Sequence, residues 1–491
     1  MNVARSQSVN VSFIRHARAT PILPSAVRRL LLPLVLCLLL CAGPAHAAPN
    51  VVVVETDDQT VSDLATMPFT RAAIGDRGVT FDNSFVSLSE CCPSRATFLT
   101  GQYAHNHGVL SIMWPYGGFN RLRGDETLPV WLRRAGYATA LVGKYLNGFR
   151  YTRVPPGWTE FDGLMGRTTY YFYDYRMNVD GHVRSFGHAV RDYQTDVITR
   201  RSVRFIRDHA GTDPFFLWTT YVAPHVGQPH DLDDPAGLKS TVPAPRDVFD
   251  FFGTPVPRPP SFDEADVSDK PPTIRNRPPL KAWQLAALER TYHQRLASLQ
   301  AVDEGVARIV STLRRAGVLS RTLLIFTSDN GYLNGEHRVL SGKILPYEPS
   351  MRVPLLMRGP GIPHGVRRSQ LVWNGDLAPT ILDATGARAA FPLDGRSLLP
   401  LARSRHVGRD RTILLEGPPA RRTNGLPRFV GVRTPRYKYV EYLWGARELY
   451  DLQRDPDELD NLAGVPTMWA VQARLARDLA RLRGCAGAQC R

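Results

Sequence analysis

Blocks of lysine and arginine, long apolar segments and internal repeats are all missing from this sequence. The positive charges are spread along the chain without an interleaved aromatic stripe, which argues against a nucleic-acid-binding protein. The apolar run from Leu30 to Cys41 is short and is interrupted by Pro33, so it makes a poor membrane span. Nothing in the composition resembles a disordered or fibrous protein.

Apolar residues are abundant enough for a large buried core. They occupy 43% of the 491 positions, a length at which a large domain with a smaller companion is expected. The formal net charge is +16, and without a nucleic-acid pattern this excess favours an anionic substrate. The composition therefore predicts a basic globular protein.

The first 47 residues have the composition of an export signal. They carry five arginines and no acidic residue, then the apolar run, then the small-residue site Ala45-His46-Ala47. This order predicts a signal peptide cleaved after Ala47, and hence a secreted or extracytoplasmic protein with no stable membrane span. An uncleaved anchor is the alternative, and Arg28-Arg29 leaves twin-arginine export open. Cleavage would lower the net charge from +16 to +11.

Cysteine is scarce, and two of the six cysteines would leave with the signal. Cys485 and Cys490 lie near the C-terminus of a chain predicted to be exported, so they could close a small disulfide loop. Cys91 and Cys92 are adjacent and cannot easily pair with each other. They need another explanation.

Four short, continuous apolar runs are typical of buried strands in an α/β sheet. Polar groups follow each run within a few residues. Because ligands of open α/β sheets bind beyond the carboxyl ends of the strands, these groups are expected to converge on one pocket. In chain order they are Val51–Val54 with Asp57 and Asp58, Ala138–Val142 with Lys144, Phe215–Tyr221 with His225, and Leu323–Thr327 with Asp329 and Asn330.

Other segments connect these strands. An amphipathic pattern predicts a helix from about Trp283 to Ala316, ended by Gly317. Many prolines between His230 and Leu280 predict an irregular surface excursion. The aromatic stretch Tyr170–Tyr175 is strand-like, and it belongs either to the core or sheet surface or to a sugar-stacking wall.

Beyond about Pro400 the pattern changes to short strands and a final helix. Phe429–Arg433 and Tyr437–Tyr442 predict strands, and the segment from about Thr467 to Leu482 predicts a helix. We therefore expect a large α/β domain over residues 48–400 and a small α+β domain over residues 401–491.

The segment Cys91-Cys92-Pro93-Ser94-Arg95-Ala96-Thr97-Phe98-Leu99-Thr100-Gly101 predicts an anion site at the start of a helix. Pro93 suits the first helical turn and Gly101 suits the end, which puts both cysteines at the N-terminus. Unpaired backbone amides and the helix dipole favour an anion there, and Arg95 adds a positive charge within one turn.

This segment resembles the signature of the sulfatase family, Cys-X-Pro-Ser-Arg followed by Leu-Thr-Gly. The resemblance implies a sulfuric ester hydrolase with an alkaline phosphatase-like α/β fold, in which helices sandwich a large mixed β-sheet beside a smaller C-terminal α+β domain. In the family a formylglycine-generating enzyme oxidises the first cysteine to formylglycine. That points to Cys91 and makes Cys92 the variable position. The alternative is a buried pair of inert cysteines.

Two further segments resemble the metal site of the family. The resemblance implies that Asp57, Asp58, Asp329 and Asn330, together with the modified Cys91, bind a divalent cation. Hard oxygen ligands of this kind suit Ca²⁺. Without the resemblance, an acidic pair would more often be a helix cap or a solvated turn.

Matches to the family extend over nearly the whole chain beyond residue 47. Lys144, His225 and Lys343 resemble the cations that bind sulfate in the family. The C-terminal residues that resemble a family signature are Glu448-Leu449-Tyr450-Asp451-Leu452, Asp455-Pro456, Glu458 and Asn461-Leu462.

One position departs from the family pattern. Many sulfatases have a histidine two or three residues after the lysine that Lys144 matches, where this chain has Leu146 and Asn147. The base that regenerates the aldehyde is therefore unassigned, with His105 and His107 as candidates and a structural role as the alternative. The motifs resemble most the N-acetylglucosamine-6-sulfatase branch, which implies a sulfated sugar or glycan as the substrate.

The resemblance implies that a hydroxyl of hydrated formylglycine at Cys91 attacks sulfur while Asp329 accepts its proton. Lys144 and Lys343 would neutralise the sulfate oxygens, and His225 would protonate the leaving alcohol. The alternatives are an arylsulfatase, a phosphonate or phosphate monoester hydrolase on the same fold, and an inactive anion- or glycan-binding homologue.

Overall fold

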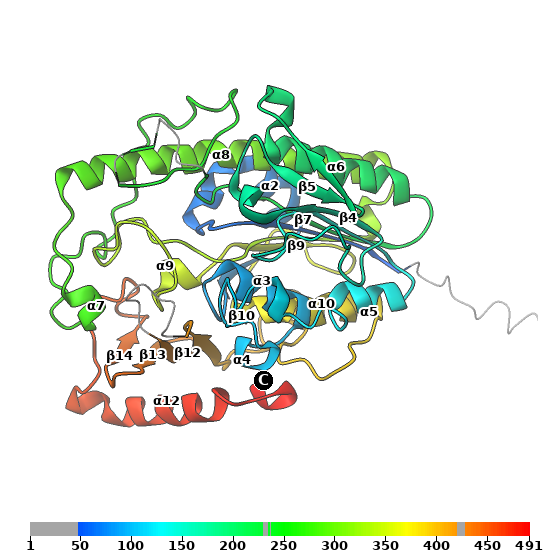
Figure 1. The fold of residues 1–491 in the computed structure, drawn as a ribbon. Coiled ribbons are helices and arrows are strands. Elements are labelled where there is room, and N and C mark those ends of the chain that lie inside the picture. The colour runs from blue at the N-terminus through cyan, green and yellow to red at the C-terminus, as the bar shows by residue number, and fades with distance from the viewer. Residues whose placement is uncertain (1–47, 229–233, 236, 420–427) are drawn as a thin grey trace, which may run out of the picture. The chain divides into compact units, whose positions relative to one another are not determined.

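A large mixed β-sheet runs through the middle of the molecule (Figure 1). The computed structural model describes residues 48–228, 234–235, 237–419 and 428–491, so the predicted signal peptide lies outside the described residues. The described chain from Ala48 to Arg491 groups into one compact unit. The domain boundary expected at residue 400 stays a prediction.

Ten strands of the described chain make up this sheet. The central pairs β1·β7, β1·β8, β3·β7 and β3·β4 are parallel, whereas β8·β9, β2·β9, β4·β5 and β5·β6 are antiparallel. In spatial order the strands are β10 (Val366–Trp373), β2 (Val79–Phe85), β9 (Leu355–Arg358), β8 (Thr322–Ser328), β1 (Asn50–Thr56), β7 (Phe215–Thr220), β3 (Ala138–Gly143), β4 (Glu160–Leu164), β5 (Arg176–Val179) and β6 (His182–Ser185).

The four predicted buried strands are confirmed as β1, β3, β7 and β8, which lie next to one another at the centre of the sheet. Successive side chains of a strand point to opposite faces, so a continuous apolar run indicates a strand that is covered on both sides. In β1, Val51 and Val53 belong to one apolar cluster and Val52 and Val54 to another.

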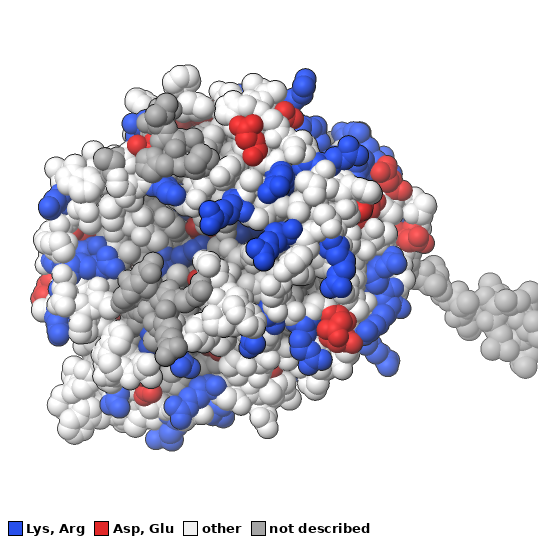
Figure 2. Space-filling view, viewed as in Figure 1, with Lys and Arg blue, Asp and Glu red and all other residues white. Residues whose placement is uncertain are grey.

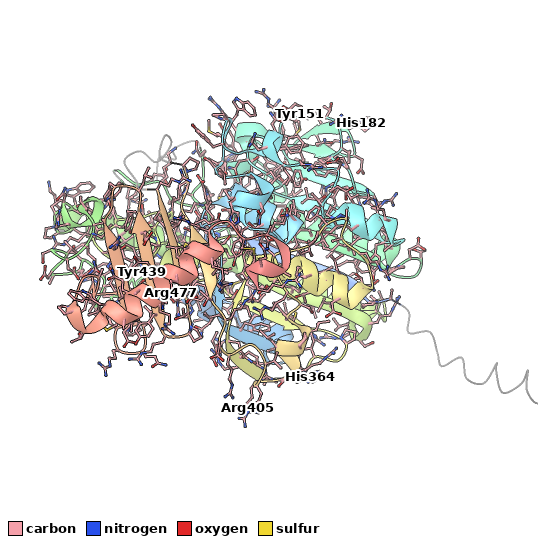
Figure 3. The ribbon with its side chains drawn as sticks, turned by 90° about the horizontal axis from the view of Figure 1, so that it is seen from below. Tyr151, His182, His364, Arg405, Tyr439 and Arg477 are labelled. Atoms are coloured by element: carbon pink, nitrogen blue, oxygen red, sulfur yellow. A yellow bond between two sulfur atoms is a disulfide. The ribbon has the colours of Figure 1, made fainter. Side chains whose placement is uncertain are left out.

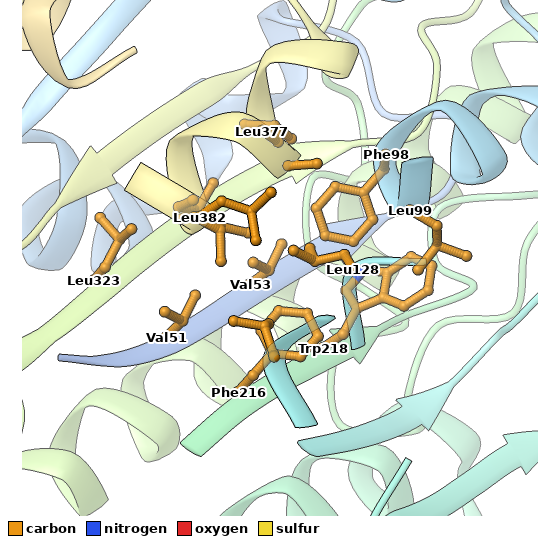
Figure 4. Close-up of a cluster of buried hydrophobic side chains, with 14 of the residues drawn as sticks. Val51, Val53, Phe98, Leu99, Leu128, Phe216, Trp218, Leu323, Leu377 and Leu382 are labelled. Atoms are coloured by element: carbon orange, nitrogen blue, oxygen red, sulfur yellow. The ribbon is translucent and has the colours of Figure 1, made fainter. Parts of the chain in front are cut away.

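Helices cover both faces of the sheet (Figure 1). Phe98, Leu99, Leu377 and Leu382 pack with Phe216 and Trp218 on one face (Figure 4). The helices of that face are α3 (Cys91–Thr100), α5 (Leu128–Arg134), α10 (Leu377–Thr385) and α11 (Leu399–Arg403), and those of the other face are α6 (Gln194–His209) and α8 (Ala282–Arg315). The short helices are α2 (Pro68–Thr70), α4 (Ala104–His107), α7 (Pro272–Arg275) and α9 (Glu348–Met351).

The longest predicted helix is confirmed as α8. Val302, Val306 and Ile309 lie on its buried face, and Gly317 follows the helix with a left-handed backbone (φ +71°), as expected of a helix end. The proline-rich region before it has little regular structure in its described residues apart from α7.

A smaller antiparallel sheet follows β10 in the chain. Its strands are β11 (Ile413–Glu416), β12 (Phe429–Arg433), β13 (Tyr437–Tyr442) and β14 (Arg447–Asp451). Helix α12 (Trp469–Leu482) lies across one face of this sheet, as Figure 3 shows around Tyr439 of β13 and Arg477 of α12. Leu475 and Leu479 of this helix are buried in the apolar cluster that it shares with the small sheet. The predicted C-terminal strands and helix are thus confirmed, as is the combination of a large mixed sheet, covering helices and a small C-terminal sheet.

Two local predictions have different outcomes. The disulfide between Cys485 and Cys490 is confirmed. The strand over Tyr170–Tyr175 is wrong, because a single helical turn ends at Tyr170 and an irregular segment follows. Phe172 and Tyr175 are buried in the core. Aromatic composition marks burial here without strand pairing.

The surface agrees with the dispersed basic charge of the sequence. Figure 2 shows Lys and Arg side chains spread over the visible face, with fewer Asp and Glu among them. Within the described residues, every helix is too short or too polar to span a bilayer.

Candidate active site

The carboxyl ends of the central strands bring the predicted polar groups together. Thr56 of β1 lies opposite Ser328 of β8 in a parallel pair, so the residues that follow, Asp57 and Asp329, emerge side by side. Gly143 of β3 pairs with Thr220 of β7 at the same edge, and Lys144 follows directly. Because parallel strands end at a common edge, residues that are about 270 positions apart in the sequence meet there.

Helix α3 places Cys91 in this cluster. The helix begins at Cys91 and ends before Gly101, which has a left-handed backbone (φ +64°). The Sγ atom of Cys91 lies 3.4 Å from Oδ1 of Asp57 and 2.9 Å from Nζ of Lys343. Cys92, the next residue, is buried in the apolar cluster between helix and sheet. The two thiols therefore have different surroundings.

Arg95 lies one turn further along α3 and is completely buried. Its Nε donates to Oδ2 of Asp329 over 2.8 Å, its Nη1 donates to the carbonyl of Lys144 over 2.9 Å, and its Nη2 lies 3.7 Å from Oδ2 of Asp57. The guanidinium thus joins the ends of three strands. It therefore orients the carboxylates of Asp57 and Asp329 within the cluster.

Two lysines bring positive charge to the carboxylates. Lys144 pairs with Asp57, and Lys343 pairs with Asp58 and lies 3.4 Å from Oδ1 of Asn330. Burial opposes ionisation of Asp57, but Lys144 and the cations beyond it hold the pKa of this carboxyl well below its usual range. Lys343 does the same for the equally buried Asp58, lowering its pKa. Both carboxyls are therefore anionic near neutral pH.

Asp58 and Asp329 have individual features. The backbone of Asp58 is left-handed (φ +66°), a conformation that costs energy in a non-glycine residue and often occurs at functional sites. Nδ2 of Asn330 donates to Oδ1 of Asp58 over 2.6 Å. Burial and the charge of Asp57 raise the pKa of Asp329 against the opposing effect of Arg95, so Asp329 is the most basic of the three carboxylates.

His225 approaches from the segment after β7. Its Nε2 lies 3.7 Å from Oδ2 of Asp58, and its Nδ1 lies 2.8 Å from the carbonyl of Val226. The carbonyl can only accept, so Nδ1 carries a proton and Nε2 faces the cluster. Burial lowers the pKa of His225 in spite of the nearby carboxylates, which favours the neutral ring.

Tyr170 is the residue that sequence reasoning missed. Its ring stacks on the imidazole of His225 with centroids 4.6 Å apart, and Nζ of Lys144 lies 4.8 Å from its centroid. Its hydroxyl accepts from Nδ2 of Asn147 over 2.7 Å. In the sequence Tyr170 belongs to an aromatic stretch, and no local pattern distinguishes it from its neighbours.

His105 and His107 are engaged elsewhere. His105 bonds Glu416 and the carbonyl of Cys485, each over 2.9 Å. The buried His107 bonds Oγ1 of Thr97 over 3.0 Å, and burial lowers its pKa to about 3. These contacts tie α4 to α3 and to the C-terminal segment, which supports the structural alternative for both.

The cluster offers donors for a divalent cation. Asp57, Asp58, Cys91 and His225 have ligand atoms within 4.8 Å of one another. The carboxylates are hard donors, as is the amide oxygen of Asn330 nearby. Apart from His105 and His107, the predicted site residues thus lie in or beside one cluster of anionic and cationic groups that could hold both a metal and a tetrahedral anion.

Comparison with known proteins agrees with this chemistry. The family model Sulfatase matches residues 49–387, and the model N-sulphoglucosamine sulphohydrolase, C-terminal, matches residues 335–484. An arylsulfatase of Volvox carteri is 36% identical over 93% of this chain and 78% of its own length. The N-acetylglucosamine-6-sulfatase of Homo sapiens is 33% identical over 72% of this chain, which spans 64% of that protein.

The fold also matches a solved structure that is described as a complex with its substrate D-glucosamine-2-N,6-O-disulfate. The TM-score is 0.74 at 24% identity, and the match covers 88% of this chain and 97% of that one. At this identity the likeness shows the fold alone. Since the family model covers well over half of the sequence and the arylsulfatase is similar over most of both chains, this chain belongs to the sulfatase family and is a sulfuric ester hydrolase.

Proposed function

We propose that this protein is an exported sulfatase that depends on formylglycine and Ca²⁺ and removes sulfate from 6-sulfated N-acetylglucosamine or a related sulfated sugar. The observation that carries the proposal is the cluster at the sheet edge. There the Sγ atom of Cys91 lies 3.4 Å from Asp57 and 2.9 Å from the ammonium of Lys343. A nucleophile position, acidic oxygens and anion-binding cations therefore meet at one point.

The acidic residues fit a hard cation. Asp57 and Asp58 are held in the anionic form, and Asp329 and Asn330 add oxygen donors at the same edge. We assign Ca²⁺ binding to these four residues together with the modified Cys91. When bound, the cation would polarise the sulfate and lower the pKa of a nearby hydroxyl.

Cys91 requires modification to act as a nucleophile. Burial and the charge of Asp57 raise the pKa of its thiol, so the unmodified group stays protonated and unreactive. A formylglycine here, made by a formylglycine-generating enzyme and then hydrated by water, would supply the hydroxyl that attacks sulfur. The aldehyde oxygen of formylglycine would replace the Sγ atom, which lies beside Asp57 and Lys343.

The remaining residues bind the anion and move protons. Lys144 and Lys343 would hold sulfate oxygens, and Arg95 would keep Asp329 in place through Nε. Asp329 has the raised pKa of a proton acceptor. His225 would take up a proton at Nε2 through its partly exposed edge and pass it to the leaving alcohol, while the Val226 carbonyl fixes the ring.

Tyr170 is expected to support substrate turnover through its ring. Tyr170→Ala removes the stack on His225 and the contact with Lys144, so we expect kcat/KM to fall about tenfold, the size of a cation–π contact in a desolvated site. Tyr170→Phe keeps the ring and loses only the bond to Asn147, so it should retain activity within about threefold. Kinetics with a sulfate ester measure both. Equal losses in the two variants would contradict a role for the ring.

Substrate choice is tested with modified enzyme and a matched set of esters. The set contains 6-sulfated N-acetylglucosamine, sugars sulfated at other positions, an aryl sulfate, and aryl phosphate and phosphonate esters. We expect the highest kcat/KM for the 6-sulfated sugar, because the sequence motifs and the N-acetylglucosamine-6-sulfatase relative favour it. A far higher kcat/KM for the aryl sulfate would favour the arylsulfatase alternative, which the similarity to the Volvox arylsulfatase supports. A dominant phosphonate rate would displace sulfate ester hydrolysis as the main activity.

Export is proposed from two features. The first 47 residues have the order of a signal peptide, and Cys485 and Cys490 form a disulfide, which persists in oxidising compartments. We therefore expect the enzyme to meet sulfated glycans outside the cytoplasm.

A further inference from the structure

Lys343 reaches the active site from an irregular segment. The segment runs from Gly342, which pairs with Leu333 in an isolated β-bridge, to the start of α9 at Glu348, and no helix or strand orients the residues between these two ends. A lysine side chain is flexible and loses much conformational entropy when it is held in one geometry. The position of the Lys343 ammonium therefore depends on what anchors the backbone around it.

The small C-terminal sheet and the loop that follows β14 supply those anchors. Nζ of Lys438 on β13 donates to the carbonyl of Pro346 over 2.8 Å. Oε2 of Glu458 accepts from the backbone amide of Glu348 over 2.7 Å, and its Oε1 accepts from Lys438 over 2.6 Å. The Lys438 and Glu458 side chains are each only 1% exposed, so water does not compete for these bonds.

Glu448 on β14 makes the third anchor. It is fully buried and accepts from the hydroxyl of Tyr347 over 2.8 Å, as well as from Tyr450 over 2.7 Å and from Tyr442. Tyr347 is the fourth residue after Lys343 and is itself completely buried. Its hydroxyl therefore ties the segment to the sheet from inside the molecule.

The same segment also contacts the start of the cysteine helix. The amide of Ile344 donates to Oγ of Ser89 over 3.2 Å, and Oγ of Ser350 donates to the same oxygen over 2.9 Å. Ser89 precedes Cys91 by two residues. The segment thus lies between the anchors of the small sheet and the nucleophile position.

We propose that Lys438, Glu448 and Glu458 are positioning residues that hold the Lys343 ammonium beside Cys91 and Asp58. The inference rests on the proposed role of Lys343 in binding the sulfate. It gives the C-terminal signature containing Glu448 and Glu458 a part in the reaction, although neither residue contacts the reacting atoms. A displacement of about 1 Å at a binding group can cost on the order of 10²-fold in rate.

The test compares Glu448→Gln and Glu458→Gln with Asp451→Asn as a matched control. Asp451 lies three residues after Glu448 on β14, points to the other face, and pairs with the partly exposed Arg436 over 2.6 Å. We expect both glutamine variants to lose about tenfold or more in kcat/KM and to bind inorganic sulfate, the product of the reaction, more weakly. The control should keep both values. If Glu448→Gln does not fold, Tyr347→Phe removes the same anchor with an isosteric ring.

A double-mutant cycle separates positioning from a general loss of structure. If Glu458 acts through Lys343, Glu458→Gln should reduce kcat/KM in the normal background and change it little in a Lys343→Met background. Equal losses in the two backgrounds, or losses matched by Asp451→Asn, would overturn the inference while the role of Lys343 stands. Full activity of Lys343→Met alone would overturn the proposed role of Lys343 and the positioning with it.

Discussion

Cys91→Ala is expected to abolish sulfate ester hydrolysis, with a fall of on the order of 10⁴-fold or more, as for the loss of a covalent nucleophile. Its thiol lies in the cluster with Asp57 and Lys343, and no other described cysteine faces that cluster. Cys91→Ser should be almost as inactive, because a plain hydroxyl would form a stable sulfate ester that cannot eliminate. Steady-state kinetics with an aryl sulfate measure the loss.

Cys92→Ala is the matched control, since it removes the same atom one residue away. Cys92 packs between α3 and the sheet, and burial raises its pKa to about 12, so the thiol is an inert core group. This variant should keep most of the activity. Its free energy of unfolding should fall by no more than about 1 to 3 kcal/mol, the cost of a small cavity. Peptide mass spectrometry of active protein should find the aldehyde at position 91 and a thiol at position 92. An aldehyde at position 92 would contradict the mechanism.

Asp57→Asn and removal of Ca²⁺ are expected to have the next largest effects. The substitution keeps the shape of the side chain and removes the charge that pairs with Lys144 and faces Arg95. We expect kcat/KM to fall by at least about 10²-fold, comparable to the loss of one strong electrostatic group in an active site. Chelation of the normal enzyme should cause a similar loss that added Ca²⁺ reverses, whereas Asp57→Asn should need far more Ca²⁺ or fail to recover.

The control for charge removal is Asp82→Asn. Asp82 of β2 forms a partly exposed pair with the exposed Arg367 of the edge strand β10, so the same chemical change there should leave activity and Ca²⁺ dependence unaltered. Asp57→Asn should also reduce thermal stability, because the buried Lys144 loses its partner. If chelation and Asp57→Asn both left activity intact, the metal assignment would be wrong.

Sequence patterns were most informative where one local rule decides the outcome. Continuous apolar runs identified the central strands, because only a strand covered on both faces tolerates apolar residues at every position. Pro93 and Gly101 delimited α3 because each residue has a specific backbone preference. The strand expected over Tyr170–Tyr175 failed, because aromatic residues serve a packed core in any backbone conformation.

By itself, therefore, the sequence determined the chemical inventory of this protein: an α/β sheet, a helix starting at Cys91, and acidic and basic groups placed after strands, since these follow from periodicity and residue type. Only the tertiary structure decided which distant side chains share a site and what supports them. The stack of Tyr170 on His225 and the anchoring of the Lys343 segment by Glu448 and Glu458 join residues 55 to 110 positions apart. No local pattern encodes such contacts, because they arise from the way the sheets pack.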